Sequence, residues 1–113
     1  MSALISVIIP VFNERDAILR SVTSASNDEN VEIIICDGGS VDGTLEILTL
    51  HFQNQVCIHK CSGGRSKCMN YGSSVSSGDI LLFLHADTIL PTNYGSAVRN
   101  AVAGTFMYIK IPD

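Results

Sequence analysis

The hydrophobic residues of this chain gather in five short runs, each separated from the next by a polar or glycine-containing stretch. The clearest run covers residues 80–84 and leads directly into His85-Ala86-Asp87-Thr88. An apolar run of this length without polar alternation is typical of a strand that is buried on both faces. We also expect Pro10 to end the first strand, because proline cannot donate to a sheet ladder. The predicted strands cover residues 4–11, 31–36, 56–59, 80–84 and 105–111.

The segments between these runs have helical spacing. Ile18, Leu19, Val22 and Ala25 share one face of a helix whose N-cap we expect to be Asn13. Comparable patterns predict helices from Thr44 to about residue 52, from 65 to 75 and from 92 to 102. Strands and helices that alternate at these lengths predict an α/β fold. We expect an open, mostly parallel sheet with right-handed crossovers and helices on both faces.

Composition places the chain among ordinary globular domains. It has 113 residues, of which 46% are hydrophobic and 16% charged, so we treat residues 1–113 as one domain. The net charge is −4 and no basic cluster is present, which argues against nucleic acid as a partner. No apolar run approaches the length of a membrane span, and the N-terminus lacks the layout of a signal peptide. We therefore expect a cytoplasmic protein without a transmembrane segment.

The cysteines leave two interpretations open. Cys57, His59 and Cys61 alternate along an extended segment, with His51 nearby, which is compatible with a metal site. The other interpretation, which we favour, is half-buried thiols in a reducing compartment, because no CxxC pair or zinc spacing is present. The four cysteines are Cys36, Cys57, Cys61 and Cys68, and Cys36 is most simply a small core residue.

Candidate chemistry follows three of the predicted strands, at residues 10–14, 37–44 and 85–88. Ligands of open α/β sheets bind outside the carboxyl ends of the strands, where these segments should meet. Asp87 could coordinate a hard cation there, or could be a turn residue or helix cap. Asp37 could accept hydrogen bonds from a base or a ribose, or could cap its own turn. Asp42 is most simply an N-cap of the helix from Thr44.

A second glycine turn precedes Arg65, whose planar guanidinium could bind a phosphate or could simply be exposed on the surface. Two common nucleotide-binding motifs are missing from the sequence. There is no GxxxxGK[ST], which excludes P-loop chemistry, and no GxGxxG follows the first strand.

Taken together, these segments resemble a known family. The blocks SVIIPVFNE (6–14), ICDGGSVDGT (35–44), GRSKCMNYG (64–72) with Gly78-Asp79, and LHADT (84–88) occur in the order seen in family 2 glycosyltransferases of the GT-A (Rossmann-like) fold. Each block is weak alone, but the set covers nearly the whole chain. It is similar to one subgroup in particular, the small bacterial enzymes of the arsenosugar-biosynthesis type.

The resemblance implies transfer of a sugar from a nucleotide-diphospho-sugar, such as a UDP- or GDP-sugar, to a hydroxyl group of an acceptor that the sequence does not name. It also implies a divalent cation, Mg²⁺ or Mn²⁺, held by Asp87, the last residue of the family's DxD-type motif. The first Asp of that motif is replaced by His85, which could be a ligand, a neighbour of the ligands, or a buried residue at the strand end without a metal role. The resemblance further implies nucleotide binding by Pro10, Phe12, Glu14, Asp37, Gly39, Ser40, Asp42 and Arg65.

A second departure concerns length. Members of this family are considerably longer than this chain, and their remaining half carries the acceptor site and the general base. We therefore expect a donor-binding half that is truncated before the acceptor half, and we assign no catalytic residue. Two alternatives remain: a non-catalytic nucleotide-sugar-binding module, and a remnant stabilised as a homodimer through the strand predicted at 105–111.

Overall fold

The computed structural model describes residues 3–102 and 108–110. Among these residues, five strands form one sheet in the order β3-β2-β1-β4-β5, and every neighbouring pair is parallel. The strands are β1 (Ile5–Val11), β2 (Val31–Asp37), β3 (Cys57–Lys60), β4 (Ile80–Phe83) and β5 (Tyr108–Lys110). The helices are α1 (Ile18–Ala25), α2 (Thr44–Phe52), α3 (Arg65–Val75) and α4 (Tyr94–Ala101), with a 3₁₀ turn, η1 (Gln53–Gln55). The predicted α/β class and element order are confirmed.

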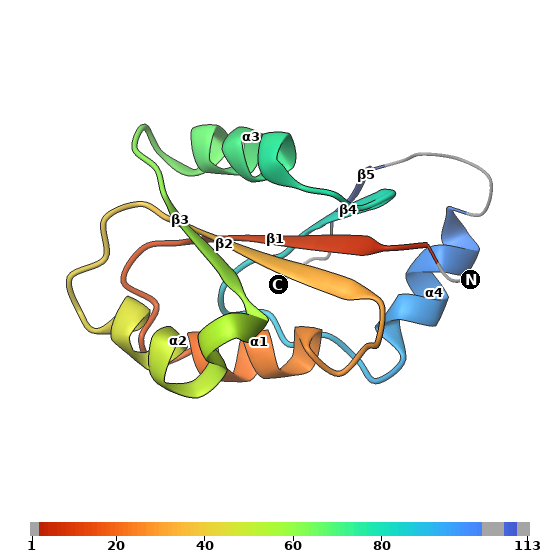
Figure 1. Ribbon diagram of the computed structural model, residues 1–113, viewed down its shortest axis with the longest axis horizontal. Helices are drawn as coiled ribbons and strands as arrows, with labels where there is room; N and C mark the ends of the chain where they lie inside the picture. Colours follow the sequence, from red (N-terminus) through yellow and green to blue (C-terminus); the bar gives the residue numbers. More distant parts are fainter. Residues whose placement is uncertain (1–2, 103–107, 111–113) are drawn as a thin grey trace.

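Helices cover both faces of the sheet (Figure 1). α1, α2 and α4 lie against one face, where Val7 and Ile9 of β1 join the larger hydrophobic core. α3 lies against the other face, where Ile8 of β1 packs with Cys68 in a smaller core. Successive residues of a strand point to opposite faces, and here both faces are covered, so the run in β1 needs no polar alternation. None of the helices within the described residues is long and apolar enough to cross a lipid bilayer.

The strand at the centre of the sheet is β1, with β2 on one side and β4 on the other. The prediction that Pro10 ends this strand is wrong, because β1 continues to Val11 and Pro10 lies opposite Cys36 of β2. Pairing with β4 stops at Ile8, whose carbonyl accepts the last bond from that side. Pro10 faces the same neighbouring strand as Ile8, but it lies beyond the last residue of β1 that pairs with β4. Its lack of an N–H therefore removes no hydrogen bond from the sheet.

The predicted N-cap of the first helix is also wrong. α1 begins at Ile18, after Ala17, and Asn13 lies in the left-handed region with a φ of 54°. The amides that follow Asn13 bind side chains of the β2–α2 loop instead of starting a helix. The carbonyl of Glu14 accepts bonds from the amides of Ala17 and Ile18, which makes a turn before the helix. The polar segment therefore stays at the sheet edge.

The other boundaries shift by a few residues. β4 ends at Phe83, so Asp87 lies just past its carboxyl end, as predicted. α3 matches the predicted span, and α4 is shorter than the predicted 92–102. Only Tyr108–Lys110 of the predicted last strand is within the described residues, where it pairs with β4; the rest of 105–111 lies outside them.

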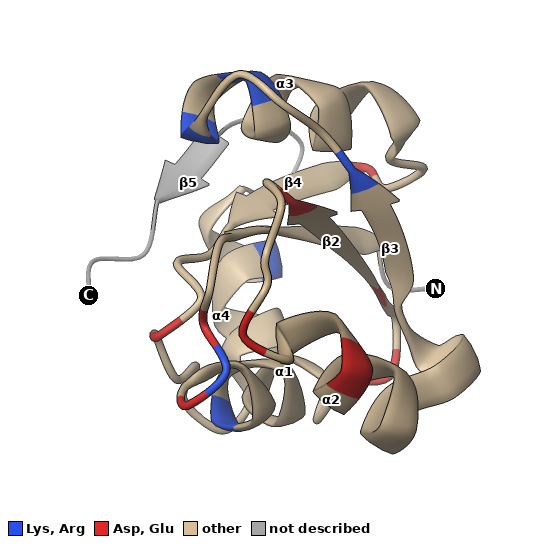
Figure 2. Cartoon of the chain, turned by 90° about the vertical axis from the view of Figure 1, so that its left-hand side faces the viewer, with Lys and Arg blue, Asp and Glu red and all other residues tan. Residues whose placement is uncertain are grey.

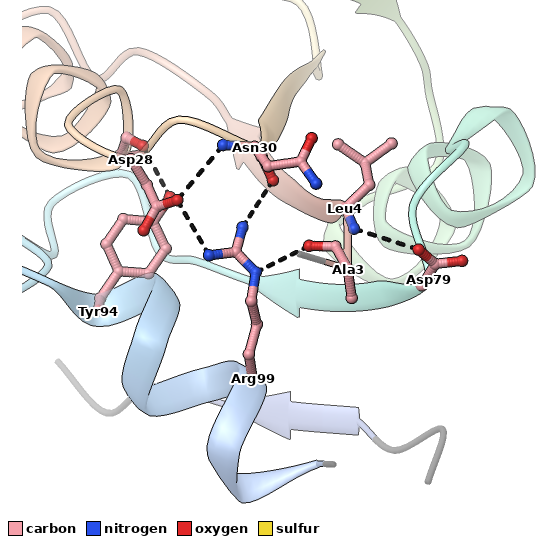
Figure 3. A network of polar contacts seen from close by, with 8 residues as sticks. Ala3, Leu4, Asp28, Asn30, Asp79, Tyr94 and Arg99 are labelled. Atoms are coloured by element: carbon pink, nitrogen blue, oxygen red, sulfur yellow. Dashed lines mark hydrogen bonds and ion pairs between the residues drawn. The ribbon is translucent and has the colours of Figure 1, made fainter. Parts of the chain in front are cut away.

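A polar clamp at the amino edge of the sheet ties α4 to the loop before β2 and to the start of β1 (Figure 3). The Arg99 guanidinium donates to the carbonyls of Ala3 and Asn30, each at 2.8 Å, and lies 3.2 Å from Asp28 Oδ1. The hydroxyl of Tyr94 donates to Ala25 O at 2.7 Å. Burial raises the pKa of Tyr94, and the Asp28 carboxylate raises it further. This phenol therefore stays protonated and keeps its hydrogen bond.

Candidate functional site

The carboxyl ends of β1 and β4, together with the first turn of α3, enclose a hollow of about 510 Å³. We call it the carboxyl-edge hollow. Figure 2 looks toward this edge and shows acidic positions in the loops in front of the sheet, with basic positions on β3 and α3. The three predicted junctions therefore meet, as parallel strands require. The residues that line the hollow are Pro10, Val11, Phe12, Glu14, Gly38, Gly64, Arg65, Cys68, His85, Ala86 and Asp87.

The β1–α1 loop and the β2–α2 loop are joined by reciprocal hydrogen bonds. The amide of Asn13 donates to Ser40 Oγ at 2.8 Å, and the Asn13 side chain accepts from the amide of Val41 at 2.8 Å. The positive φ of Asn13 places its amide and side chain for both bonds, and asparagine tolerates this conformation better than most residues. Ser40 therefore holds the β1–α1 loop at one edge of the hollow.

Thr44 is the buried centre of the same junction. Its hydroxyl accepts a hydrogen bond from the amide of Glu14 at 3.0 Å and donates to Asp42 Oδ1. Asp42 also accepts from the amides of Arg15 at 3.1 Å and Thr44 at 3.0 Å. The hydrogen bond from the Thr44 hydroxyl is the main cause that lowers the pKa of the Asp42 carboxyl below its usual value. Partial burial raises this pKa, and the bonds from the two amides lower it. Asp42 thus fastens the loops together, and its carboxylate does not line the carboxyl-edge hollow.

Asp37, the last residue of β2, is buried and caps the turn that follows it. Its Oδ2 accepts from the amides of Gly39 at 3.0 Å and Ser40 at 3.1 Å. Gly39 has a φ of 111°, a conformation in which a side chain would be strained. Asp37, Gly39 and Ser40 line a second hollow of about 430 Å³, the side hollow, next to Lys60 and Cys61. The capping interpretation of Asp37 matches this geometry, and base binding by Asp37 stays a prediction.

Both signs of charge meet in the carboxyl-edge hollow. Burial, and then the charge of Asp87, raise the pKa of the Glu14 carboxyl, while the Arg65 guanidinium partly offsets them. Arg65 begins α3 directly after Gly64, and His85 and Asp87 follow β4. Phe12 is 59% exposed at the same edge although it is a large apolar residue. An exposed aromatic ring beside a mixed charge cluster favours binding of a ligand that is part planar and part anionic.

Residues 6–103 match the model of a protein family described as Glycosyl transferase family 2. This chain belongs to glycosyl transferase family 2. Glycosyltransferase AglE of Haloferax volcanii is 38% identical over 91 residues, which cover 74% of this chain and 30% of AglE. Glycosyltransferase GlyG of Streptococcus pneumoniae is 30% identical over 99 residues, which cover 82% of this chain and 33% of GlyG. The chain thus spans about a third of the length of these two curated family members.

Solved structures agree with the family 2 assignment at the level of fold. The crystal structure of S. aureus TarS 1-349 superposes with a TM-score of 0.73 at 22% identity, covering 88% of this chain and 33% of that one. A second structure of that protein, in complex with UDP-GlcNAc, has the same TM-score and identity. The expected GT-A fold is therefore confirmed, while the arsenosugar-type subgroup stays a prediction.

Within this family 2 domain, the structure brings together Pro10, Phe12, Glu14, Arg65, His85 and Asp87. It places Asp37, Gly39 and Ser40 in the side hollow, whereas Asp42 lines neither hollow. The alternative metal site at Cys57, His59, Cys61 and His51 does not form. Among the described residues, no group of three or more His, Cys, Asp or Glu side chains could hold a metal ion. His59 instead contacts the Tyr71 ring edge-on, with centroids 5.3 Å apart.

The expectation of reduced cysteines is not what the structure shows for one pair. Cys61 and Cys68 form a disulfide, with Cα atoms 5.8 Å apart, while Cys36 is buried and free and Cys57 is exposed and free. Cys61 directly follows β3 and Cys68 lies in the first turns of α3, so the glycine turn between them brings the two side chains together. Their spacing of seven residues across that turn is the signal that sequence reasoning passed over.

Sequence reasoning also missed Thr44 and Gly38. The sequence predicts Thr44 only as the start of a helix, yet its hydroxyl joins two segments. Gly38 lines both hollows, and its amide donates to Val11 O at 2.9 Å. A Cβ at Gly38 would contact Phe12 at ordinary van der Waals distance, so this glycine is less constrained than Gly39.

Proposed function

We propose that the carboxyl-edge hollow binds a nucleotide-diphospho-sugar, and that this chain is the donor-binding part of a glycosyltransferase. The full reaction would move the sugar from the nucleotide to a hydroxyl group of an acceptor. The observation that carries this proposal is the meeting of Glu14, Arg65, His85 and Asp87 in one hollow at the carboxyl edge of a family 2 domain. The relatives named above are glycosyltransferases, which supports the same reaction class.

The nucleoside would occupy the side of the hollow formed by β1. Pro10 and the exposed ring of Phe12 offer an apolar surface to a base or ribose, and Glu14 is an acceptor for hydroxyl or N–H groups. Gly38 lines the same hollow and has no side chain to occupy it. The loop bonds from Ser40, Asp42 and Thr44 fix this side before a ligand arrives, which lowers the entropy cost of binding.

The diphosphate would lie toward Arg65 and Asp87. A guanidinium binds phosphate oxygens in a bidentate manner, and the glycine turn before Arg65 lets the backbone approach closely. Without a cation, Asp87 would repel the same diphosphate. Asp87 is an exposed carboxylate and His85 a partly exposed imidazole, and both are side chains of a kind that could hold a divalent cation there.

We therefore propose Mg²⁺ or Mn²⁺ as the cofactor, held by Asp87 and His85. An imidazole suits Mn²⁺ better than Mg²⁺, so His85 favours the former. When bound, such a cation would stabilise the negative charge of the departing nucleoside diphosphate. The proton of the acceptor hydroxyl must be taken by a base, and we place that base outside the residues named here.

Calorimetric titration tests the proposal. Wild-type protein is titrated with UDP and with GDP, each with and without Mn²⁺, and UDP is the first probe because TarS is known in complex with UDP. The Asp87→Ala variant removes the cation ligand. Glu29→Ala is the matched control, because it also removes one exposed carboxylate but lies on the loop before β2, at the opposite edge.

We expect Mn²⁺-dependent binding of one nucleotide in wild type and in Glu29→Ala, and its loss in Asp87→Ala. His85→Ala should weaken Mn²⁺-dependent binding more than Mg²⁺-dependent binding. Binding that is equal with and without cation would contradict the metal assignment but leave the nucleotide site. A folded protein that binds neither UDP nor GDP under any of these conditions would contradict the donor-site proposal itself.

A further inference from the structure

The Cys61–Cys68 disulfide lies between the two hollows. Cys61 lines the side hollow and Cys68 lines the carboxyl-edge hollow, while Gly38 borders both. The bridge therefore forms part of the wall that separates the proposed nucleotide site from its neighbour. Cys68 is 3% exposed and belongs to the smaller core, whereas Cys61 is only partly buried.

The bridge ties the residue after β3 to the first turn of α3, across the glycine turn that directly precedes Arg65. Between the two cysteines lie Ser62, Gly63, Gly64, Arg65, Ser66 and Lys67, all exposed. Gly63 and Gly64 have φ values of 103° and 90°. Glycine adopts these values easily, but it adopts many others as well, so the two glycines alone do not fix the conformation of the turn. Its backbone anchors are at its ends, where Cys61 N donates to Asp37 O at 2.9 Å and Cys68 N donates to Gly64 O at 3.1 Å.

We propose that Cys61 and Cys68 are a reversible thiol–disulfide modification site that controls the position of Arg65, and with it the affinity for the donor diphosphate. The inference rests on the proposed donor site and adds a mode of regulation to it. In the oxidised form the closed turn presents Arg65 to the hollow. In the reduced form the two-glycine turn is held only at its ends, so the start of α3, which carries Arg65, is less firmly placed and must be positioned when the ligand binds, and affinity falls.

The co-reactants are a dithiol for reduction and a small-molecule disulfide for oxidation. In reduction, one thiolate of the dithiol attacks Cys61 Sγ, the more accessible sulfur; the S–S bond breaks, and Cys68 leaves as a thiolate and takes up a proton. The second thiol of the reagent then attacks the mixed disulfide, which releases Cys61 and leaves the reagent as a cyclic disulfide. Two electrons pass from the reagent to the protein, and oxidation reverses these steps.

The remaining cysteines are placed so that they do not compete. Cys36 packs in the same small core as Cys68, but burial raises the pKa of its thiol, and a protonated thiol does not attack a disulfide. Cys57 is exposed but lies at the start of β3, while Cys61 follows its end. The site is thus a single pair, and Cys57 provides a natural control.

The test begins with the thiols themselves. Protein treated with oxidised glutathione and protein treated with dithiothreitol are alkylated in denaturant and weighed by mass spectrometry. We expect Cys61 and Cys68 to be protected from alkylation without a glutathione adduct in the first sample, and all four thiols to react in the second, with peptide mapping to the Cys61–Cys68 pair. UDP is then titrated into both samples in the presence of Mn²⁺. We expect the Kd to rise roughly fivefold on reduction and to recover on reoxidation.

Three variants show whether the bridge acts through Arg65. In Cys57→Ser the redox difference in Kd should be the same as in wild type. In Cys61→Ser the affinity should equal that of reduced wild type under both conditions, with circular dichroism confirming the fold. In Arg65→Gln binding should be weaker and the redox difference should vanish, because the guanidinium is what the bridge positions.

Each of the other possible results would contradict one particular part of the proposal. If four thiols react after oxidation, or if Kd is unchanged by reduction, the switch is wrong while the donor site stands. If the redox difference persists in Arg65→Gln, the bridge does not act through Arg65. If UDP fails to bind in either redox state, the proposed function fails and this inference fails with it, whereas the thiol count still reports on the bridge.

Discussion

The two edges of the parallel sheet use polar residues in opposite ways. At the amino edge, polar groups bind one another: Arg99 joins Asp28 and two carbonyls, and the amide of Leu4 donates to Asp79 at 3.1 Å. At the carboxyl edge, hydroxyls and carboxylates bind backbone amides of the loops, while Glu14, Arg65 and Asp87 line a hollow. The first edge joins separate segments of the fold, and the second holds loops still around a space.

This difference separates residues whose polar groups bind other parts of the fold from residues that line the hollow and that we propose bind the donor. The raised pKa of Glu14 shows that its ionised form is disfavoured in the free protein, mainly by burial and then by Asp87. A perturbed carboxyl in a hollow is a sign of a binding site, because a structural role would favour partners that lower its pKa. At the amino edge, by contrast, the Arg99 guanidinium lies beside the partly buried Asp28 carboxylate.

The largest effect should come from Arg99→Ala, which breaks the clamp at the amino edge. The variant leaves two carbonyls and the partly buried Asp28 without their shared donor, so we expect a loss of about 3 kcal/mol in the free energy of unfolding. Arg20→Ala, on the exposed side of α1, should cost little. Urea denaturation measures both. A folded Arg99→Ala protein with weakened UDP binding would contradict the separation of the two edges.

The next effect should come from the one covalent link at the carboxyl edge. Removing the Cys61–Cys68 bridge frees a short loop in the unfolded chain, which predicts a loss of about 2.5 kcal/mol in Cys61→Ser. Reduced wild type should show the same loss, whereas Cys57→Ser should not. Chemical denaturation with and without dithiothreitol measures the difference. A reduced protein as stable as the oxidised one would show that this turn needs no covalent closure.

Thr44→Val should have a smaller effect on stability and a further effect on binding. Valine keeps the volume of the buried side chain but leaves the Glu14 amide without its acceptor, so we expect a loss of about 1 to 2 kcal/mol. UDP binding should also weaken, because the loop that carries Glu14 is released. Thr49→Val, on the exposed face of the same helix, is the matched control. Equal binding by both variants would mean that the ligand does not depend on that loop.

Most of the fold follows from the sequence because the strands are continuous apolar runs with helices between them. Residues 80–84 predicted a buried strand, and the span of α3 was correct because two glycines and a serine-rich stretch bound it. The junctions at the carboxyl edge were predictable too, since parallel strands must end on the same side. These inferences needed only local pattern and topology.

The remaining details depend on contacts between segments far apart in the sequence. Asn13 has the character of an N-cap locally, but its bonds to Ser40 and Val41, across 27 and 28 residues, place it elsewhere. Thr44 and Glu14 likewise meet only because β1 and β2 are neighbours. The cysteine pair depends on how the end of β3 faces α3. Tertiary contacts of this kind override local propensity, and a single sequence does not specify them.

The smallest effect, and the one that bears most directly on the contrast between the edges, concerns Glu14. The folded protein binds the Glu14 proton more tightly than the unfolded chain, whose carboxyl has its ordinary pKa of 4.5. The free energy of unfolding therefore falls as pH rises from 4.5 through the raised pKa. Glu14→Gln has no titrating carboxyl, so relative to wild type it should gain a little stability over that range, an effect that solvent screening keeps small.

A substitution at Asp87 can measure how much this residue contributes to the raised pKa of Glu14. Its charge is the second cause of the raised pKa, after burial, so Asp87→Asn should lower the pKa of Glu14 without restoring its usual value. NMR titration of the Glu14 carboxyl in both proteins measures this directly, and Glu29→Gln, at the opposite edge, should leave it unchanged. An unaltered Glu14 titration in Asp87→Asn would mean that the two carboxylates do not share one hollow in solution, and one ligand could not then contact both the β1 and the β4 side of the site.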